Sequence, residues 1–139
     1  MQAAPTPEVV SAQELRIVDG TGQTRILLSA KSGAPTILLL GADGKATLTA
    51  QADAAGRPAV TLANPLATGP TAVIEIDAKG AHVKFDRPGG ASAYLFLNNQ
   101  GMSGTVLIDA AGRRRFQATV AADGTSRLER LDESGKPLP

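Results

Sequence analysis

The chain has 139 residues, 42% of them hydrophobic, with 14 basic and 13 acidic side chains and a formal charge of +1. This length suits one domain with a core, and the balance of apolar and charged residues argues against disorder. Three Phe, one Tyr, no Trp and no basic excess exclude the basic, aromatic surface of a typical nucleic-acid binder, so no nucleic-acid partner is expected. The lack of cysteine excludes disulfides, thiolate catalysis and zinc–thiolate sites.

Residues 1–13 are predicted to be a flexible leader. The first eight residues, MQAAPTPE, lack the basic and apolar regions of a signal peptide and look like the Ala- and Pro-rich tether that follows a cleavage site. This favours a secreted or cell-envelope protein whose signal or lipoprotein segment has been removed, and a native cytosolic tail is the alternative. No apolar run approaches the ~18 residues of a membrane-spanning helix, so no transmembrane segment is expected.

Residues 14–135 are predicted to form a single all-β repeat domain, with a frayed tail over residues 136–139. Short strand-like runs alternate with a turn signal about every 11 residues, which is typical of an antiparallel meander. No stretch keeps a 3.6-residue period, so no helix is expected. The predicted strands are Glu14–Val18, Thr24–Ser29, Thr36–Leu40, Lys45–Gln51, Pro58–Ala63, Thr71–Ile76, Ala81–Phe85, Ser92–Leu97, Ser103–Ile108, Arg114–Val120 and Thr125–Leu131.

The turns between these strands share one chemistry and one period. Most begin with Asp or Asn, whose side chain bonds its own backbone, and end with Gly, which accepts the positive φ that closes the turn. Every second turn recurs at steps of 22 or 23 residues. These turns start at Asp19, Gly41, Asn64, Asp86, Asp109 and Asp132. A 22–23-residue repeat with two strands per copy therefore indicates a repeat architecture.

Two apolar columns follow the same period and are predicted to face inward. They are Ile37, Val60, Val83, Val106 and Leu128, and Ile26, Leu48, Ile74, Leu95 and Phe116. Two assemblies fit: a closed ring of hairpins, which removes the sheet edges, or a β-solenoid, whose coils stack in parallel. Hairpin-like turns and columns of mixed apolar type favour a closed shallow antiparallel barrel of about five repeated β-hairpins. The β-solenoid is the alternative.

The repeats end in an aliphatic run followed by Asp-x-x-Gly, as in Val106–Gly112 and Ile74–Gly80. In this pattern the chain resembles the β-flower family over residues 14–135. The resemblance implies a shallow, symmetric β-barrel whose hairpins spread like petals around an apolar centre. Some members look like lipoproteins, which agrees with the Ala- and Pro-rich leader, and the family supplies no catalytic residues.

The polar residues do not form a catalytic or metal-binding pattern. His82, the only histidine, precedes the column residue Val83 and by alternation points away from the core, so a Ser–His–Asp triad is not expected. The aspartates fall at one or two per turn, which suits Asx turns better than a calcium loop. We expect no enzymatic activity, no metal and no cofactor.

Two predicted strands, Thr36–Leu40 and Ser92–Leu97, are apolar on both faces, so their second face needs a cover: a neighbouring layer, a partner subunit or an apolar ligand. In a closed ring their side chains would line a central depression that suits a lipid tail. The candidate ligand-binding residues are Leu27, Leu38, Leu40, Tyr94, Phe96 and Met102. The sequence thus predicts a non-catalytic binding module of the cell envelope with a hydrophobic or lipid-like ligand. The alternative is a structural, self-associating module, a homo-oligomer with no small-molecule ligand.

Overall fold

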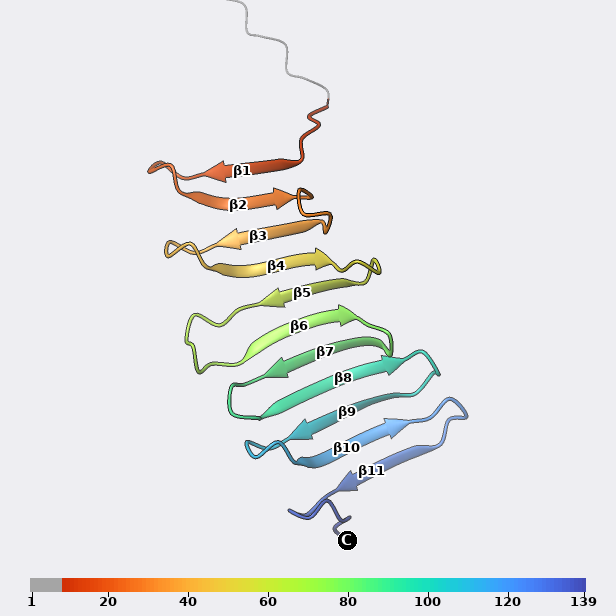
Figure 1. Ribbon diagram of the computed structural model, residues 1–139. Helices are drawn as coiled ribbons and strands as arrows, with labels where there is room; N and C mark the ends of the chain where they lie inside the picture. Colours follow the sequence, from red (N-terminus) through yellow and green to blue (C-terminus); the bar gives the residue numbers. More distant parts are fainter. Residues whose placement is uncertain (1–8) are drawn as a thin grey trace, which may run out of the picture.

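The computed structural model describes residues 9–139 as one antiparallel sheet without helices (Figure 1). Eleven strands follow one another in chain order, and each pairs with its neighbours in the sequence. The strands are β1 (Glu14–Val18), β2 (Thr24–Ser29), β3 (Thr36–Leu40), β4 (Ala46–Ala52), β5 (Pro58–Leu62), β6 (Thr71–Ile76), β7 (Gly80–Asp86), β8 (Ser92–Asn98), β9 (Ser103–Ile108), β10 (Arg114–Val120) and β11 (Ser126–Arg130). All the predicted strands are confirmed, with every boundary within one residue. Residues 1–8 of the predicted leader lie outside the described part.

Most hairpins close through the same turn, which explains why the strand boundaries could be predicted. At Asp19 the carbonyl oxygen accepts the amide of Gly22 at 2.9 Å, and Gly22 has a φ of 83°. The carboxylate of Asp19 accepts the amide of Thr21, also at 2.9 Å. Such short loops with a glycine of positive φ are among the commonest hairpin connections. The Asp-to-Gly spacing of the sequence therefore fixes where each strand ends.

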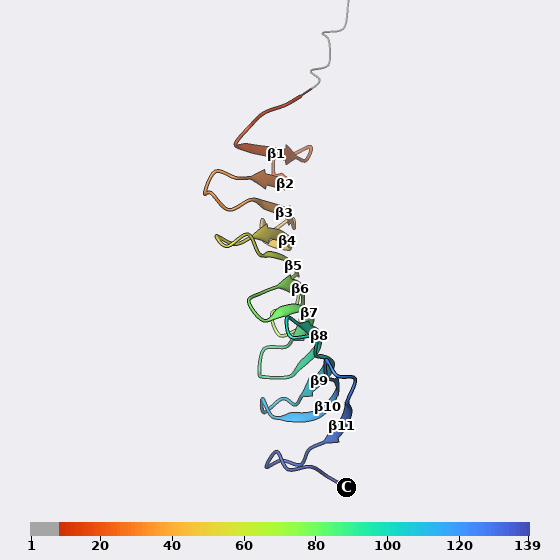
Figure 2. The same ribbon diagram turned by 90° about the vertical axis from the view of Figure 1, so that its right-hand side faces the viewer.

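The sheet does not close on itself, so the predicted closed barrel is wrong. β1 and β11 lie at opposite ends of the sheet (Figures 1 and 2), and the strand order contains no pair between them. Strand direction alternates along a meander, so with eleven strands β1 and β11 run the same way (Figure 1). Closure would thus need one parallel pair in an otherwise antiparallel ring. The solenoid alternative is wrong as well, because all neighbouring strands pair antiparallel in chain order.

A single layer of strands has very little interior. Among the described residues, the only buried hydrophobic side chains are Val106, at 5% exposed, and Leu131, at 9%. Apart from Val106, no member of the two columns predicted to face inward is buried, and Ile74, Leu95 and Leu128 are 61%, 62% and 69% exposed. The reason is that an open sheet has no second layer to cover them. Just after β11 the chain turns back, and Pro137 forms an antiparallel bridge with Leu131.

Candidate functional site

The sheet has two chemically different faces, because successive residues of a strand point to opposite sides. Cross-strand pairing is continuous, so the residues of each face form ladders that cross all eleven strands. We call the first face the apolar face and define it by two ladders. They are Leu15, Leu28, Ile37, Ala50, Val60, Ile74, Val83, Leu95, Thr105, Ala118 and Leu128, and Ile17, Ile26, Leu39, Leu48, Leu62, Ala72, Phe85, Ala93, Leu107, Phe116 and Arg130.

The apolar face contains one polar residue, Thr105, and one charged residue, Arg130, which lies on the last strand. From β1 to β10 its ladders therefore carry no charge. Yet its large side chains are in contact with water, as at Phe85, which is 50% exposed. Exposing a surface of this kind to water costs free energy in proportion to its apolar area.

The apolar face is uneven because small side chains interrupt the large ones along its ladders. Between Leu95 and Leu128 in the first ladder stand only Thr105 and Ala118. These small residues leave a shallow hollow of about 430 Å³ between β8 and β11. The hollow is large enough to hold side chains from a covering layer.

We call the opposite side the mixed face. Its ladders are Arg16, Leu27, Leu38, Thr49, Thr61, Val73, Lys84, Tyr94, Val106, Gln117 and Glu129, and Glu14, Ser29, Thr36, Gln51, Ala59, Glu75, His82, Phe96, Gly104, Thr119 and Arg127. Polar and charged residues on this face pair with each other. Nε2 of His82 lies 2.7 Å from Oε1 of Glu75, and Nζ of Lys84 lies 2.6 Å from Oδ2 of Asp86. This face can therefore remain in water.

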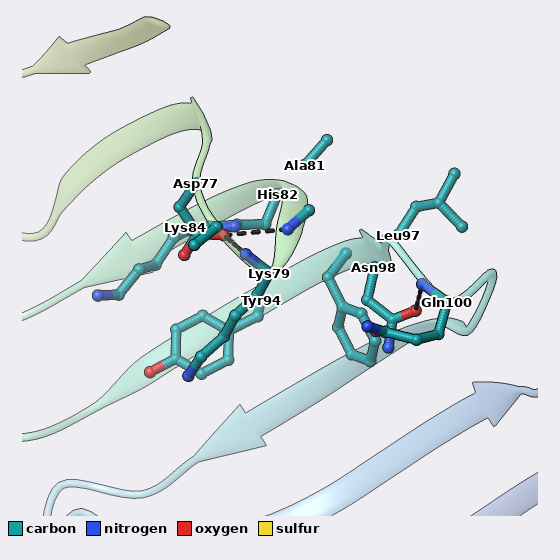
Figure 3. Close-up of a pocket in the computed structure, with 12 residues that line it drawn as sticks. Asp77, Lys79, Ala81, His82, Lys84, Tyr94, Leu97, Asn98 and Gln100 are labelled. Carbon is teal, nitrogen blue, oxygen red and sulfur yellow. Dashed lines mark hydrogen bonds between the residues drawn. The ribbon is translucent and has the colours of Figure 1, made fainter. Parts of the chain in front are cut away.

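A hollow of about 550 Å³ lies on the mixed face beside the turns that start at Asp77 and Asn98 (Figure 3). Tyr94, Phe96 and Lys84 are among its lining residues. The amide of Lys79 donates to the Asp77 carboxylate at 2.7 Å, and this hydrogen bond lowers the pKa of Asp77. The hollow thus combines two aromatic rings with polar turn groups.

The side chains of this hollow already have structural partners. Nζ of Lys84 lies 5.6 Å from the centre of the Tyr94 ring, and its hydrogen bond with Asp86 raises the pKa of Lys84. The Phe96 ring lies over Gly104, where an added Cβ would be 3.0 Å from its Cζ. Large rings over a strand glycine restore cross-strand packing that glycine cannot provide. Within residues 9–139, no three His, Asp or Glu side chains come together as metal ligands would.

The structure does not bring the six predicted ligand-binding residues together. Leu27 and Leu38 are cross-strand neighbours on the mixed face, and Leu40 ends β3. Tyr94 and Phe96 lie on β8 of the same face, five strand spacings or about 24 Å from β3. Met102 lies beside the turn at Asn98 and is 38% exposed. Their role in binding a ligand stays a prediction.

Sequence reasoning missed the apolar face as a surface, although its periodic columns contained nine of the 22 residues in the two ladders. Four members of one predicted column, including Ile37 and Leu128, lie in the first ladder, whereas Val106 lies on the mixed face. The period was therefore informative about which residues share a face. The period did not indicate that this face would be left without a covering layer.

Comparison of the chain with protein-family models, with curated proteins and with solved structures gave no match. The resemblance to the β-flower family thus stays a prediction. In the part of the chain that the structure describes, no helix is long and apolar enough to cross a membrane. The fold and its two faces define the class of this molecule as a single-layer antiparallel meander with one apolar side.

Proposed function

We propose that the protein is a non-catalytic association module whose working surface is the apolar face. The observation that carries this proposal is an apolar surface without charge that continues over β1 to β10. Soluble monomers rarely expose contiguous apolar patches larger than a few hundred Å², and larger ones mark interaction sites. Association with another apolar body would remove this surface from water.

An extended partner suits this surface better than the predicted lipid-like ligand. The predicted ligand site required an apolar centre inside a closed ring, and the sheet is open. Small-molecule sites are concave and enclose most of the ligand, whereas the apolar face offers one shallow hollow of about 430 Å³. The structural, self-associating alternative is therefore our leading proposal. A place in the cell envelope stays a prediction.

Three turn carboxylates, those of Asp19, Asp53 and Asp109, are poorly suited to acid–base catalysis near pH 7. The hydroxyl and amide of Thr21 donate to Asp19 and lower its pKa to about 2. Hydrogen bonds from Arg57 and from the Arg113 amide likewise lower the pKa of Asp53 and Asp109. A general acid or base near pH 7 needs a pKa shifted the other way.

The proposal is tested by comparing two neighbouring positions on opposite faces of the central strand. The chain has no cysteine, so Ile74→Cys and Val73→Cys each introduce a single thiol. In the isolated sheet residue 74 is 61% exposed and residue 73 is half-buried. A cover on the apolar face would reverse this order, so we expect a water-soluble thiol reagent to label Ile74→Cys at least tenfold more slowly than Val73→Cys. Faster labelling at position 74 would show an uncovered face and would overturn the proposal.

A further inference from the structure

We infer that the occupant of the apolar face is a second copy of this chain, packed face to face as the other layer of a β-sandwich. This inference rests on the proposed function, because it names what covers the same surface. Three observations carry it: the area that the chain exposes, the length and composition of the face, and the order of large and small residues along its first ladder.

The exposed area is too large for a folded monomer and suits an obligate dimer. The chain exposes 10003 Å², whereas a folded monomer of 14.2 kDa exposes roughly 6,800 Å². The first eight residues, outside the described part, account for at most about 1,300 Å² even as an extended chain. About 2,000 Å² per chain remains in excess, or about 4,000 Å² for two copies, which lies in the range of obligate homodimer interfaces.

The face needs a cover of its own length. Eleven strands at the usual spacing extend over about 50 Å, far more than a single small ligand covers. A second copy has the same length, and two antiparallel sheets pack with their apolar sides together at about 10 Å. Arg130, the one charge on the face, lies on the edge strand β11, where it reaches the polar rim that interfaces keep.

The order of side chains along the first ladder favours one arrangement of the two copies. β6 is the middle strand, and a two-fold axis along it would place β4 opposite β8, β3 opposite β9 and β2 opposite β10. In that arrangement each small residue of the first ladder meets a large one, and in the second ladder the two Ala72 residues meet at the axis. The pairs are Ala50 with Leu95, Thr105 with Ile37, and Ala118 with Leu28.

Large residues facing small ones allow two layers to interdigitate without voids. The hollow of about 430 Å³ between β8 and β11 would then be filled by Ile37 and Leu28 of the second copy. An axis across the strands that ran along the first ladder would place Ala50 on Ala50 and Leu95 on Leu95, which leaves a void at one site and a clash at the other. The axis along β6 instead brings the two Ile74 side chains together.

The test combines native mass spectrometry with substitutions that place opposite charges at position 74. The wild-type chain is expected as a ligand-free dimer of about 28 kDa, twice the 14.2 kDa of one chain. Ile74→Asp and Ile74→Lys place like charges at the axis, so each should raise the dimer dissociation constant at least 100-fold, since buried charges need a partner. An equimolar mixture, refolded together, should restore the dimer as a heterodimer of the two variants. This result holds even if either variant alone fails to fold.

Val73→Asp is the matched control, because it lies next to Ile74 on the mixed face, opposite Lys84. It should change the dissociation constant by no more than about threefold, as expected of a solvated charge pair. A monomer that carries a lipid or other adduct, with a protected thiol at position 74, would overturn the second copy and leave the proposed function standing. A bare monomer with a reactive thiol would overturn both. A mixture of the charge variants that fails to form the heterodimer would overturn the axis along β6.

Discussion

The two faces of this sheet differ in how far their side chains are shielded from water. On the mixed face, charges pair locally, as in Lys84 with Asp86, and Val106, the cross-strand neighbour of Tyr94, is only 5% exposed. On the apolar face, Leu95 on the adjacent strand remains 62% exposed, although its ladder neighbours are as apolar as those of Val106. Antiparallel sheets commonly pack one face and leave the other in water. The comparison supports our proposal that this chain supplies one layer of a two-layer structure.

The largest predicted effect compares Leu95→Ala with Val106→Ala. If a second copy covers Leu95, its truncation should lower the free energy of unfolding by about 2–4 kcal/mol per chain, as in a protein core. Val106→Ala should cost about 1–2 kcal/mol, because it removes two buried carbons. Urea unfolding at one fixed protein concentration measures both values. In an uncovered sheet the order would be the opposite, with the smaller loss at the exposed Leu95.

The same comparison can be sharpened with a compensating change at the facing position. Ala50→Leu adds volume where we place Leu95 of the second copy, so it should weaken the dimer by itself. Combined with Leu95→Ala, which makes room for it, it should recover most of the stability that each single change loses. Strict additivity of the two losses would place the residues far apart in the assembly.

A smaller effect is expected at Gly80, on the mixed face. This residue is buried with a φ of 148°, and an added Cβ would lie 2.6 Å from Cα of Asn98 on the next strand. Gly80→Ala should therefore cost about 2 kcal/mol. Gly112→Ala is the control, because its φ is 76° and its Cβ would meet nothing within 4 Å, so only the backbone strain of about 1 kcal/mol remains.

The measurement is urea unfolding together with the dimer dissociation constant. We expect Gly80→Ala to lower the free energy of unfolding and to leave the dimer dissociation constant within about threefold, because the residue lies away from the apolar face. Equal losses for the two glycines would contradict the close approach of β8 to Gly80.

The elements that sequence analysis predicted best are those decided by local chemistry. The Asp-to-Gly turns, such as Asp109–Gly112, set the ends of the strands, and alternation assigned Leu48 and Phe116 to the same face. Closure of the sheet depends instead on how the first and last strands meet, which no local pattern encodes. The strand count bears on closure only in part, since eleven strands close into a ring only with one parallel pair. The candidate site depended on the same closure: in the open sheet, Leu38 and Tyr94 lie on strands that are not neighbours, and their role in binding stays a prediction.

The smallest predicted effect concerns the turns, which belong to neither face. Hydrogen bonds from Thr21 lower the pKa of Asp19 from 3.8 to about 2, so the folded state holds fewer protons on this carboxyl than the unfolded state does. Its contribution to stability is thus complete above pH 3.8 and is lost as the pH falls toward 2. Asp19→Asn keeps an acceptor oxygen without the charge, and it should flatten the pH dependence of urea unfolding in this window. The ladders of the apolar face contain no carboxylate, so the loss caused by Leu95→Ala should be the same at pH 7 and pH 3. A loss that changed with acid would place titrating groups at the covered surface and would contradict an interface without carboxylates.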